Sequence, residues 1–461
     1  MPTPSSLHPL IIMCPFPAAG HINPLLEITT HLTTGGFPVF FLCSDPFTDR
    51  VRSAGAEPWP NSSGPLTPET IRGQFALPQG HLRWNYQQKH IFLDGAPERH
   101  AILERCLASV QERFPEREVV IFNEVLFLGA VPYLLGKTPP GGKKLKVINF
   151  HTTVDWTVKE GCAPYGLVLP PAKGEEERRE YARLYEELRP AARETVVYAN
   201  EMMRSLGARE DVEGDFFFSE VTMLADVVLM ACSPSLEYPR DDGHDEGQPM
   251  IKYIGGLPRG CSDDETEFLS LWKDLEDNER LPLGERSRKR VVFVSQGTAN
   301  NDEYGELVIP TMEALGSRED LLVVVTLGKR DASLPASVVV PGNAMVVDHV
   351  PYHAVLSIAD VFVFNGGYGG LMHAVMSGVP MVIAGTAADK GEVAARAEWA
   401  GVAVNLRTST PIATIVRAAV DKVLDDESFK TKAMELKREN EALDALGRIE
   451  TQIWTICERS G

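Results

Sequence analysis

The chain has 461 residues, which is too long for a single hydrophobic core and fits two domains of roughly 200 residues each. Its 44% apolar and 24% charged residues are typical of a globular protein without repeats or low-complexity tracts. The formal net charge of −19 argues against a nucleic-acid-binding protein, because phosphate backbones require a basic face.

Cysteine usage and apolar runs indicate the cellular setting. The seven cysteines are scattered, odd in number and free of Cys-x-x-Cys pairs, which indicates a reducing compartment without disulfides or a zinc site. No apolar run approaches the roughly 20 residues of a membrane span. The run "LIIMCPF" has no basic segment before it and is only as long as a strand, so we interpret it as a buried strand and not as a signal peptide. We therefore expect a cytoplasmic protein, either a monomer or a weak homodimer.

The first half of the chain shows the strand–helix–strand rhythm of a parallel sheet. An apolar strand over 9–14 is followed by a Pro/Gly turn, a helix and the apolar run "PVFFLCS"; "EVVIFNEVLFLGAVPYLLG" and "KKLKVINF" repeat this pattern. Residues 55–100 are predicted as loops rich in Pro, Gly and aromatics, and residues 174–211 as a helix with a charged outer face. The run "LADVVLMACSPSLEYP" is predicted to be the last strand of this domain.

The second half repeats the rhythm. Six short apolar runs, from "RVVFVSQGTAN" to "GVAVNL", alternate with helical stretches and predict a second doubly wound α/β sheet. The acidic, turn-rich stretch "RDDGHDEGQP" predicts an exposed linker. We therefore predict an α/β protein of two Rossmann-like, doubly wound domains facing each other across a cleft. The predicted parts are an N-terminal domain (1–238), a linker (239–250), a C-terminal domain (251–435) and a helix (436–461) that packs back across the domains.

A glycine cluster follows one strand of the second domain. In "ADVFVFNGGYGGLMHAVMSGVP" an apolar run leads into residues 365–370, Asn-Gly-Gly-Tyr-Gly-Gly, and a helical pattern follows at once. Helix N-termini carry unpaired N–H donors and a partial positive charge, and glycine lacks the Cβ that would keep a diphosphate away. A tight turn with close packing is the alternative. Four glycines in six residues exceed what a turn requires, which favours diphosphate binding.

Two strand ends of the first domain carry groups suited to proton transfer. His21 stands at the start of a helix, where the dipole disfavours the imidazolium, so we expect a ring neutral enough to act as a base near pH 7. Glu124, at another strand end of the same sheet, can hold the other ring nitrogen, fix the tautomer and stabilise the cation. The alternatives are a helix cap or surface residue for His21, and a solvated strand end for Glu124.

Both regions match a known family. "PFPAAGHINPLLEI" resembles the opening of the family 1 UDP-dependent glycosyltransferases, which have the GT-B fold, and residues 348–406 are similar to their donor-binding signature. The resemblance covers the whole chain and is closest to the soluble branch that acts on secondary metabolites in bacteria and fungi. It implies that His21 is the general base and that Glu124 stands where the family has an orienting aspartate.

The resemblance also implies a donor site. In the family, an aromatic side chain stacks on uracil and a backbone group contacts the base edge, while a loop and a glycine cradle hold the diphosphate and a pair of residues holds the sugar hydroxyls. The residues of this chain that the resemblance assigns to the site are Gly20, Ser295, Gly297, Thr298, His349, Val350, Asn365, Gly367, Gly369, Gly370, Asp389 and Lys390. His349 takes the stacking position, Val350 contacts the base edge, and Asp389 and Lys390 hold the sugar.

Four departures from the family pattern concern this site. Asn365 replaces a histidine, residues 368–370 replace a Trp-Asn-Ser run, His373 replaces a glutamate, and Lys390 replaces a glutamine. Asparagine still donates a hydrogen bond, but backbone amides must hold more of the phosphate. Lys390 can contact a sugar hydroxyl, pair with Glu392 or contact the diphosphate, and the sequence leaves these alternatives open.

The function implied is that of an inverting, metal-independent glycosyltransferase. It moves a hexose, most simply glucose from UDP-glucose, to a hydroxyl of a lipophilic small molecule, with no cofactor beyond the donor. Aromatic and thioether side chains in residues 75–92, Trp156, Tyr165 and residues 202–203 suit an apolar acceptor pocket, although each of them can equally be core. The alternatives are a GT-B-fold UDP-sugar isomerase or epimerase, and a catalytically inactive sugar-nucleotide-binding subunit.

Overall fold

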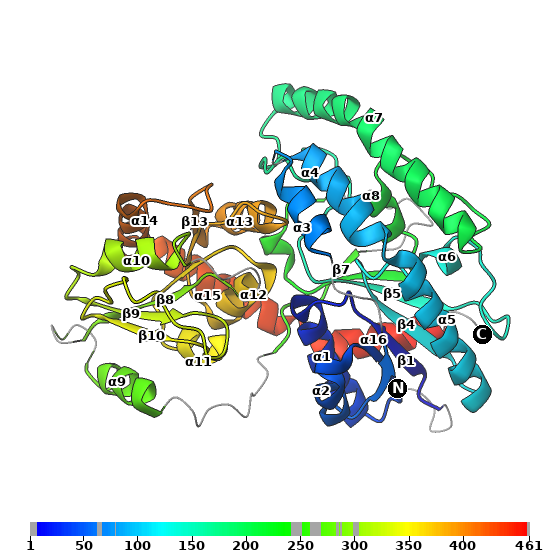
Figure 1. Cartoon of the computed structure of the whole chain (residues 1–461), viewed down its shortest axis with the longest axis horizontal. Helices are drawn as coiled ribbons and strands as arrows, with labels where there is room; N and C mark the ends of the chain where they lie inside the picture. The colour runs from blue at the N-terminus through cyan, green and yellow to red at the C-terminus, as the bar shows by residue number, and fades with distance from the viewer. Residues whose placement is uncertain are drawn as a thin grey trace. The chain divides into compact units, whose positions relative to one another are not determined.

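The computed structural model describes residues 7–61, 67–78, 80–240, 251–258, 269–282, 285, 288–297 and 304–458. The chain divides into two units (Figure 1). The first contains Met1–Ala231, Pro239–Leu257 and Leu443–Gly461, and the second contains Cys232–Tyr238 and Pro258–Ala442. Among the described residues, no helix is both long and apolar enough to cross a membrane.

The first unit is built on a parallel sheet of seven strands in the order β3-β2-β1-β4-β5-β6-β7. The strands are β1 (Leu10–Cys14), β2 (Val39–Cys43), β3 (Glu57–Pro60), β4 (Val119–Glu124), β5 (Lys146–His151), β6 (Val227–Met230) and β7 (Ile251–Tyr253). The strand order reverses between β1 and β4, whose register pairs Cys14 with Asn123. Their carboxyl ends therefore meet at a topological switch point, where ligands bind in open α/β sheets.

Helices cover both faces of this sheet. They are α1 (Ala19–Thr34), η1 (Asp45–Phe47), α2 (Thr48–Ser53), α3 (Pro68–Phe75), α4 (His81–Tyr86), the π-helical η2 (Gln87–Leu93), α5 (Ala96–Arg113), α6 (Val131–Leu134), α7 (Glu175–Ser205), α8 (Phe217–Thr222) and α16 (Ala445–Glu458). Because strand side chains alternate between faces, Ile11 and Met13 of β1 pack in the core with α1 and α16, while Leu10 and Ile12 pack in the core with α5. This explains why the strand is apolar at every position.

The second unit repeats the architecture with six parallel strands in the order β10-β9-β8-β11-β12-β13. They are β8 (Arg290–Ser295), β9 (Leu321–Thr326), β10 (Ala344–Val347), β11 (Val361–Phe364), β12 (Met381–Ile383) and β13 (Ala403–Asn405). The helices are η3 (Pro234–Leu236), α9 (Leu269–Glu279), α10 (Val308–Leu315), α11 (Tyr352–Leu356), α12 (Tyr368–Ser377), α13 (Lys390–Trp399), α14 (Ala413–Asp425) and α15 (Glu427–Ala442). Here the order reverses between β8 and β11, which pair Ser295 with Phe364. The predicted two doubly wound α/β sheets are confirmed.

Two predicted boundaries differ from the structure, and a third lies largely outside the described residues. The second domain was expected from residue 251, whereas β7 pairs with β6 through Val228 and Ile251 and so extends the first sheet. The predicted single C-terminal helix is interrupted at Asp444, where φ is 51°; α15 ends in the second unit and α16 packs in the first. The predicted linker falls largely on 241–250, outside the described residues.

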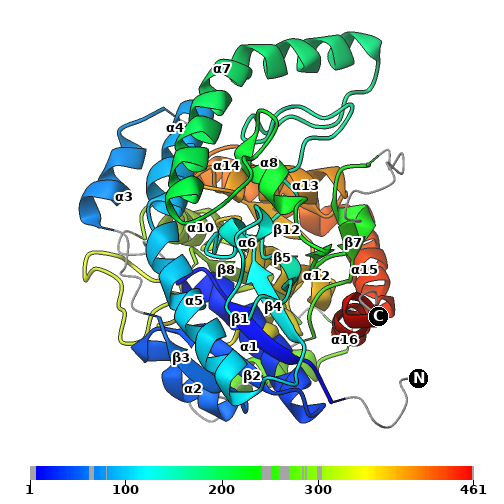
Figure 2. The same cartoon turned by 90° about the vertical axis from the view of Figure 1, so that its right-hand side faces the viewer.

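The segment predicted as loops over residues 55–100 instead contains β3, α3, α4 and η2. Its local pattern is weak because the apolar side chains of α4 and η2 pack on a distant part of the chain, chiefly α7 (Figure 2). Tertiary packing thus outweighs the weak helical pattern of this segment.

Candidate active site

His21, Glu124 and a threonine that the sequence analysis did not single out meet at the switch point of the first sheet. His21 lies in the first turn of α1, Glu124 ends β4, and Thr152 directly follows β5. His21 Nδ1 lies 3.1 Å from Glu124 Oε1, and Thr152 Oγ1 lies 2.8 Å from each of these two atoms. The three groups therefore form one hydrogen-bonded cluster, with Glu124 fully buried and His21 partly exposed.

The second oxygen of Glu124 is also held. Phe16 donates its backbone N–H to Glu124 Oε2 at 3.2 Å, and the Arg99 guanidinium stands 5.3 Å from the centre of the Phe16 ring. Burial lowers the pKa of Arg99 to about 10, against the opposing charges of Glu124 and Glu98. Glu124 is thus no solvated strand end, because buried donors and a nearby cation surround it.

A charged group that the sequence analysis missed follows Thr152. Asp155 is fully buried, forms an ion pair with Lys159 Nζ at 3.0 Å and accepts a hydrogen bond from Arg240 Nη1 at 2.9 Å. Burial alone would raise the pKa of Asp155, but the two cations hold it well below its usual range. Burial also lowers the pKa of His151 to about 4, and its ring stands 4.9 Å from that of Trp156. The polar run that follows the buried strand of residues 146–151 was the available signal.

An aromatic pocket opens in the same unit. It contains about 560 Å³ of space, part of it open to solvent, and is lined by His81, Trp84, Asn85, Gln88, Trp156, Val158, Pro164, Tyr165, Tyr185, Leu188, Ala192, Phe216, Phe218 and Ser219. Trp156 and Tyr165, two of the side chains predicted for an acceptor pocket, line this pocket. Met203 instead lies fully buried in the core, and Met202 packs against that core.

A series of aromatic contacts connects this pocket with His21. The Phe218 and Phe92 rings are 5.7 Å apart, Phe92 and Phe16 are 5.6 Å apart, and Phe16 stands 5.4 Å from the His21 imidazole, edge to face. Such T-shaped pairs are favourable aromatic geometries. The imidazole therefore lies at one end of a series of packed aromatic rings whose other end, Phe218, lines the pocket.

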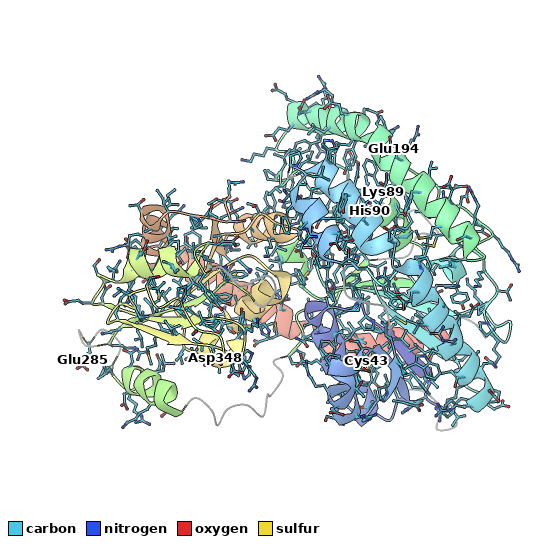
Figure 3. The ribbon with its side chains drawn as sticks, in the orientation of Figure 1. Cys43, Lys89, His90, Glu194, Glu285 and Asp348 are labelled. Atoms are coloured by element: carbon cyan, nitrogen blue, oxygen red, sulfur yellow. The ribbon has the colours of Figure 1, made fainter. Side chains whose placement is uncertain are left out.

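Helix α7 forms one wall of the pocket and is tied to η2. Lys89 of η2 lies 3.8 Å from Glu194 of α7 (Figure 3), and the Tyr198 hydroxyl of α7 donates to Asp94 just after η2. Asp94 also accepts from His90 Nδ1 at 2.9 Å, if that nitrogen carries the proton. These contacts hold the wall of the pocket against the segment that supplies Trp84 and Gln88.

The glycine cluster lies at the switch point of the second sheet. It joins β11 to α12, and Gly367 precedes the first helical residue without any side chain capping the helix. Gly366 has a φ of 82°, and a Cβ on Gly370 would lie 3.0 Å from Phe364 Cδ2, so the turn and the packing require these two glycines. A Cβ on Gly369 would meet nothing within 4 Å. The turn alternative thus explains two of the four glycines and does not explain Gly369.

Asn365 and Ser295 support this turn. The Asn365 amide donates to the Gln296 carbonyl, and its Oδ1 accepts from Gly367 N at 3.4 Å. Ser295 is fully buried, accepts from Gly297 N at 3.1 Å and shares a hydrogen bond with the Tyr352 hydroxyl. Both side chains therefore brace the loops after β8 and β11, where the prediction had given them direct phosphate contacts. Thr298 lies outside the described residues.

The remaining predicted donor residues also follow strands of this sheet or begin helices. His349 and Val350 follow β10; the His349 N–H donates to Asp348 at 2.7 Å, and Val350 is buried. Asp389 directly precedes α13 and Lys390 is its first residue. Gly20 lies in the first turn of α1, where a Cβ would meet nothing within 4 Å.

One of the alternatives for Lys390 is disfavoured. Glu392 contacts the Arg396 guanidinium, which also lies 3.3 Å from Glu237 of the segment that enters the second unit. Burial lowers the pKa of Lys390, against the charges of Asp389 and Glu306. Its Cδ would lie 3.3 Å from a Cβ on Gly385, and that Cβ would overlap the Asn365 carbonyl. The lysine stem thus runs beside the glycine turn.

Comparison with known proteins identifies the family. The model of the C-terminal domain of erythromycin biosynthesis protein CIII-like proteins matches residues 310–447, and that of the glycosyltransferase N-terminal domain matches residues 9–63. UDP-glucosyltransferase 1 of Beauveria bassiana (strain ARSEF 2860) is 36% identical over 450 residues, covering 96% of this chain and 94% of the relative. UDP-glucosyltransferase B1 of Starmerella bombicola is 33% identical over 454 residues, covering 96% and 98%.

A solved structure shares the fold. The glycotransferase of kitacinnamycin superposes with a TM-score of 0.69 at 23% identity, covering 97% of this chain and 99% of that one. The chain has two doubly wound sheets, with a histidine–carboxylate cluster at one switch point and a glycine-rich turn at the other. Because its full-length relatives are more than 30% identical, it belongs to the UDP-dependent glycosyltransferases of the GT-B fold.

Proposed function

We propose that this enzyme transfers glucose from UDP-glucose to a hydroxyl of a lipophilic, aromatic small molecule, with inversion at the anomeric carbon and without a metal ion. The observation that carries the proposal is the His21–Thr152–Glu124 cluster, joined by aromatic rings to an aromatic pocket in the same unit. The names of the full-length relatives support UDP-glucose as the donor.

His21 is the proposed general base. Its Nδ1 is engaged by Glu124 and Thr152, so the Nε2 atom is the one that takes a proton from the acceptor hydroxyl. The acceptor oxygen then forms a bond to the anomeric carbon as the bond from that carbon to the phosphate oxygen breaks. The proton ends on His21, where Glu124 stabilises the imidazolium, and UDP departs with the negative charge.

The glycine turn of the second unit is the proposed site for the departing diphosphate. The first N–H groups of α12 have no intrahelical acceptors, no acidic side chain stands in its first turn, and the helix dipole favours an anion there. Amides already oriented towards a developing charge stabilise the transition state without reorganisation. Gly369 leaves room for this anion because the position where its Cβ would stand is open.

The pocket favours a flat, uncharged acceptor. Its lining contains six aromatic side chains, Trp84, Trp156, Tyr165, Tyr185, Phe216 and Phe218, together with neutral polar groups such as Asn85, Gln88 and Ser219. Aromatic faces at 5–6 Å spacings bind planar rings by offset or edge-to-face contact. A polyhydroxylated phenol would present both the ring for the pocket and the hydroxyl for the base.

The test measures both products of the reaction. The enzyme is incubated with UDP-glucose, with and without a phenolic acceptor library, and UDP release and glycoside mass are followed. UDP released only with acceptor, together with a β-glycoside, is the expected result; interconversion of the sugar indicates an isomerase, and tight binding alone indicates an inactive subunit. TDP-glucose in parallel tests the choice of nucleotide.

A variant pair tests the base. His21→Ala should lower turnover by roughly 10²–10⁴-fold, the usual contribution of general base catalysis, while UDP affinity measured by calorimetry stays unchanged. Tyr185→Phe, which alters a pocket side chain and keeps its ring, is the control. Loss of UDP affinity with normal turnover in His21→Ala would contradict the assignment.

A further inference from the structure

Thr152 occupies an unusual position between the proposed base and its carboxylate. Its single hydroxyl lies 2.8 Å from His21 Nδ1 and 2.8 Å from Glu124 Oε1, whereas the direct distance from Nδ1 to Oε1 is 3.1 Å. The residue is buried, and Glu124 is fully buried. Within this cluster, His21 and Glu124 therefore each lie closer to the Thr152 hydroxyl than to one another.

The hydroxyl has one proton to donate, and the carboxylate decides where it goes. An ionised carboxylate only accepts hydrogen bonds, so Thr152 must donate to Glu124. The lone pairs of Thr152 then face the imidazole, and a stable contact at 2.8 Å requires that Nδ1 carry a hydrogen. Donation from Nδ1 to Thr152 and to Glu124 leaves the ring lone pair on Nε2.

We infer that Thr152 is a positioning residue that donates to Glu124, accepts from His21 and thereby fixes the imidazole in its Nδ1–H tautomer. This inference rests on the proposed function, in which Nε2 removes the acceptor proton. Thr152 touches neither substrate nor the reacting atoms in this scheme. It acts through His21, by keeping the basic nitrogen on the opposite side of the ring from the carboxylate.

A purely structural role would predict a different result. Thr152→Val keeps the shape of the side chain and removes the hydroxyl, so packing is nearly preserved while the relay is lost. Thr152→Ser keeps the hydroxyl and removes a methyl group. If packing were the purpose, valine would be the better replacement; if the relay is the purpose, serine restores function and valine does not.

The first measurement needs no turnover. Nitrogen-15 NMR of the histidine side chains in the ligand-free protein, assigned by the loss of signals in His21→Gln, should show a protonated Nδ1 and an unprotonated Nε2 in neutral His21. In Thr152→Val the two nitrogen shifts should move towards each other, because the Nδ1 proton then keeps only the longer contact of 3.1 Å to Glu124. A wild-type ring with its proton on Nε2 overturns the inference even if no Thr152 variant folds.

The second measurement separates the roles kinetically. Loss of a hydrogen bond to a charged group corresponds to roughly a 10- to 100-fold effect, so kcat of Thr152→Val should fall by that factor with KM for the donor unchanged. The matched control is Thr195→Val, another fully buried threonine in the same unit, whose hydroxyl has no hydrogen-bond partner among the described residues. It should turn over like the wild type.

The outcomes distinguish the inference from the proposed function. Normal kcat in Thr152→Val, or a fall in kcat without any change in the His21 nitrogen shifts, overturns the role of Thr152 and leaves His21 as the base. Full transfer by His21→Ala overturns the assignment of His21 as the general base, on which the inference rests. A fall in kcat in Thr152→Val that Thr152→Ser reverses, together with the change in nitrogen shifts, supports the relay.

Discussion

Acidification should destabilise the first unit through one buried imidazole, His151. This residue ends β5, is fully buried, packs its ring against Trp156 and has no hydrogen-bond partner for either ring nitrogen among the described residues. Burial lowers its pKa from 6.5 to about 4, although the carboxylates of Asp155 and Glu124 act in the opposite direction. The folded protein therefore keeps this histidine neutral where the unfolded chain protonates it.

The magnitude follows from the two pKa values. The difference between 6.5 unfolded and about 4 folded is about 2.5 units, and each unit corresponds to about 1.4 kcal/mol. Because the folded-state pKa is depressed, the free energy of unfolding has its full value above pH 6.5. It decreases by about 3 kcal/mol as the pH falls towards 4, because the unfolded chain then binds the proton that folded His151 does not. The depressed pKa of Asp155 affects stability in a separate pH range, below the ordinary carboxyl pKa of 3.8.

The assay compares urea unfolding of the wild type and of His151→Gln between pH 7.5 and pH 4.5. The pH dependence of the wild type alone is insufficient, because another group acts in the same pH range. Burial raises the pKa of Glu27 to about 7, so protonation of this carboxyl stabilises the fold as the pH falls. The difference between the two proteins isolates the histidine: the variant should lose less stability than the wild type on acidification. His90→Gln, which changes an exposed histidine, is the control and should follow the wild type. A constant difference between wild type and His151→Gln across this range would refute the reasoning.

Three further changes test other parts of the molecule. Gly369→Val should keep the fold, because a Cβ at this position meets nothing within 4 Å. It should weaken UDP binding at least tenfold in calorimetry, because the side chain fills the proposed anion position; an unchanged UDP affinity would contradict diphosphate binding at this turn. Trp84→Ala should raise KM for an aromatic acceptor roughly 10- to 100-fold and leave UDP affinity unchanged, because its ring lines the pocket and contacts Tyr165 and Phe218; an unchanged KM would place the acceptor elsewhere. Arg396→Gln should destabilise the second unit by about 3–5 kcal/mol, because the buried Glu237 and Glu392 lose its guanidinium, and an unchanged urea midpoint would show that the pairs contribute nothing.

Much of the fold could be predicted from local pattern. The apolar runs that form most of the strands (β1, β2, β4, β5 and β8–β13) are short and bounded by turn residues. Their alternation with helical patterns indicates parallel sheets, because the helices connect successive strands. β7 has three residues and no pattern of its own; only its pairing with β6 makes it a strand. The helices of residues 81–93 were missed because their aromatic side chains Trp84 and Phe92 pack against distant parts of the chain, namely α7 and Trp156.

For the site, the sequence by itself determined which chemical groups follow strands: an imidazole after β1, a carboxylate ending β4 and glycines after β11. The sequence shows where a strand ends because the run of apolar residues stops there. Only the tertiary structure decided that Thr152 stands between His21 and Glu124, that Asn365 and Ser295 turn inward to brace loops, and that Gly369 alone among the cluster faces open space. These facts depend on side-chain direction and on contacts between residues 28 to 131 positions apart. Strand order and register set these contacts, and no local pattern encodes them.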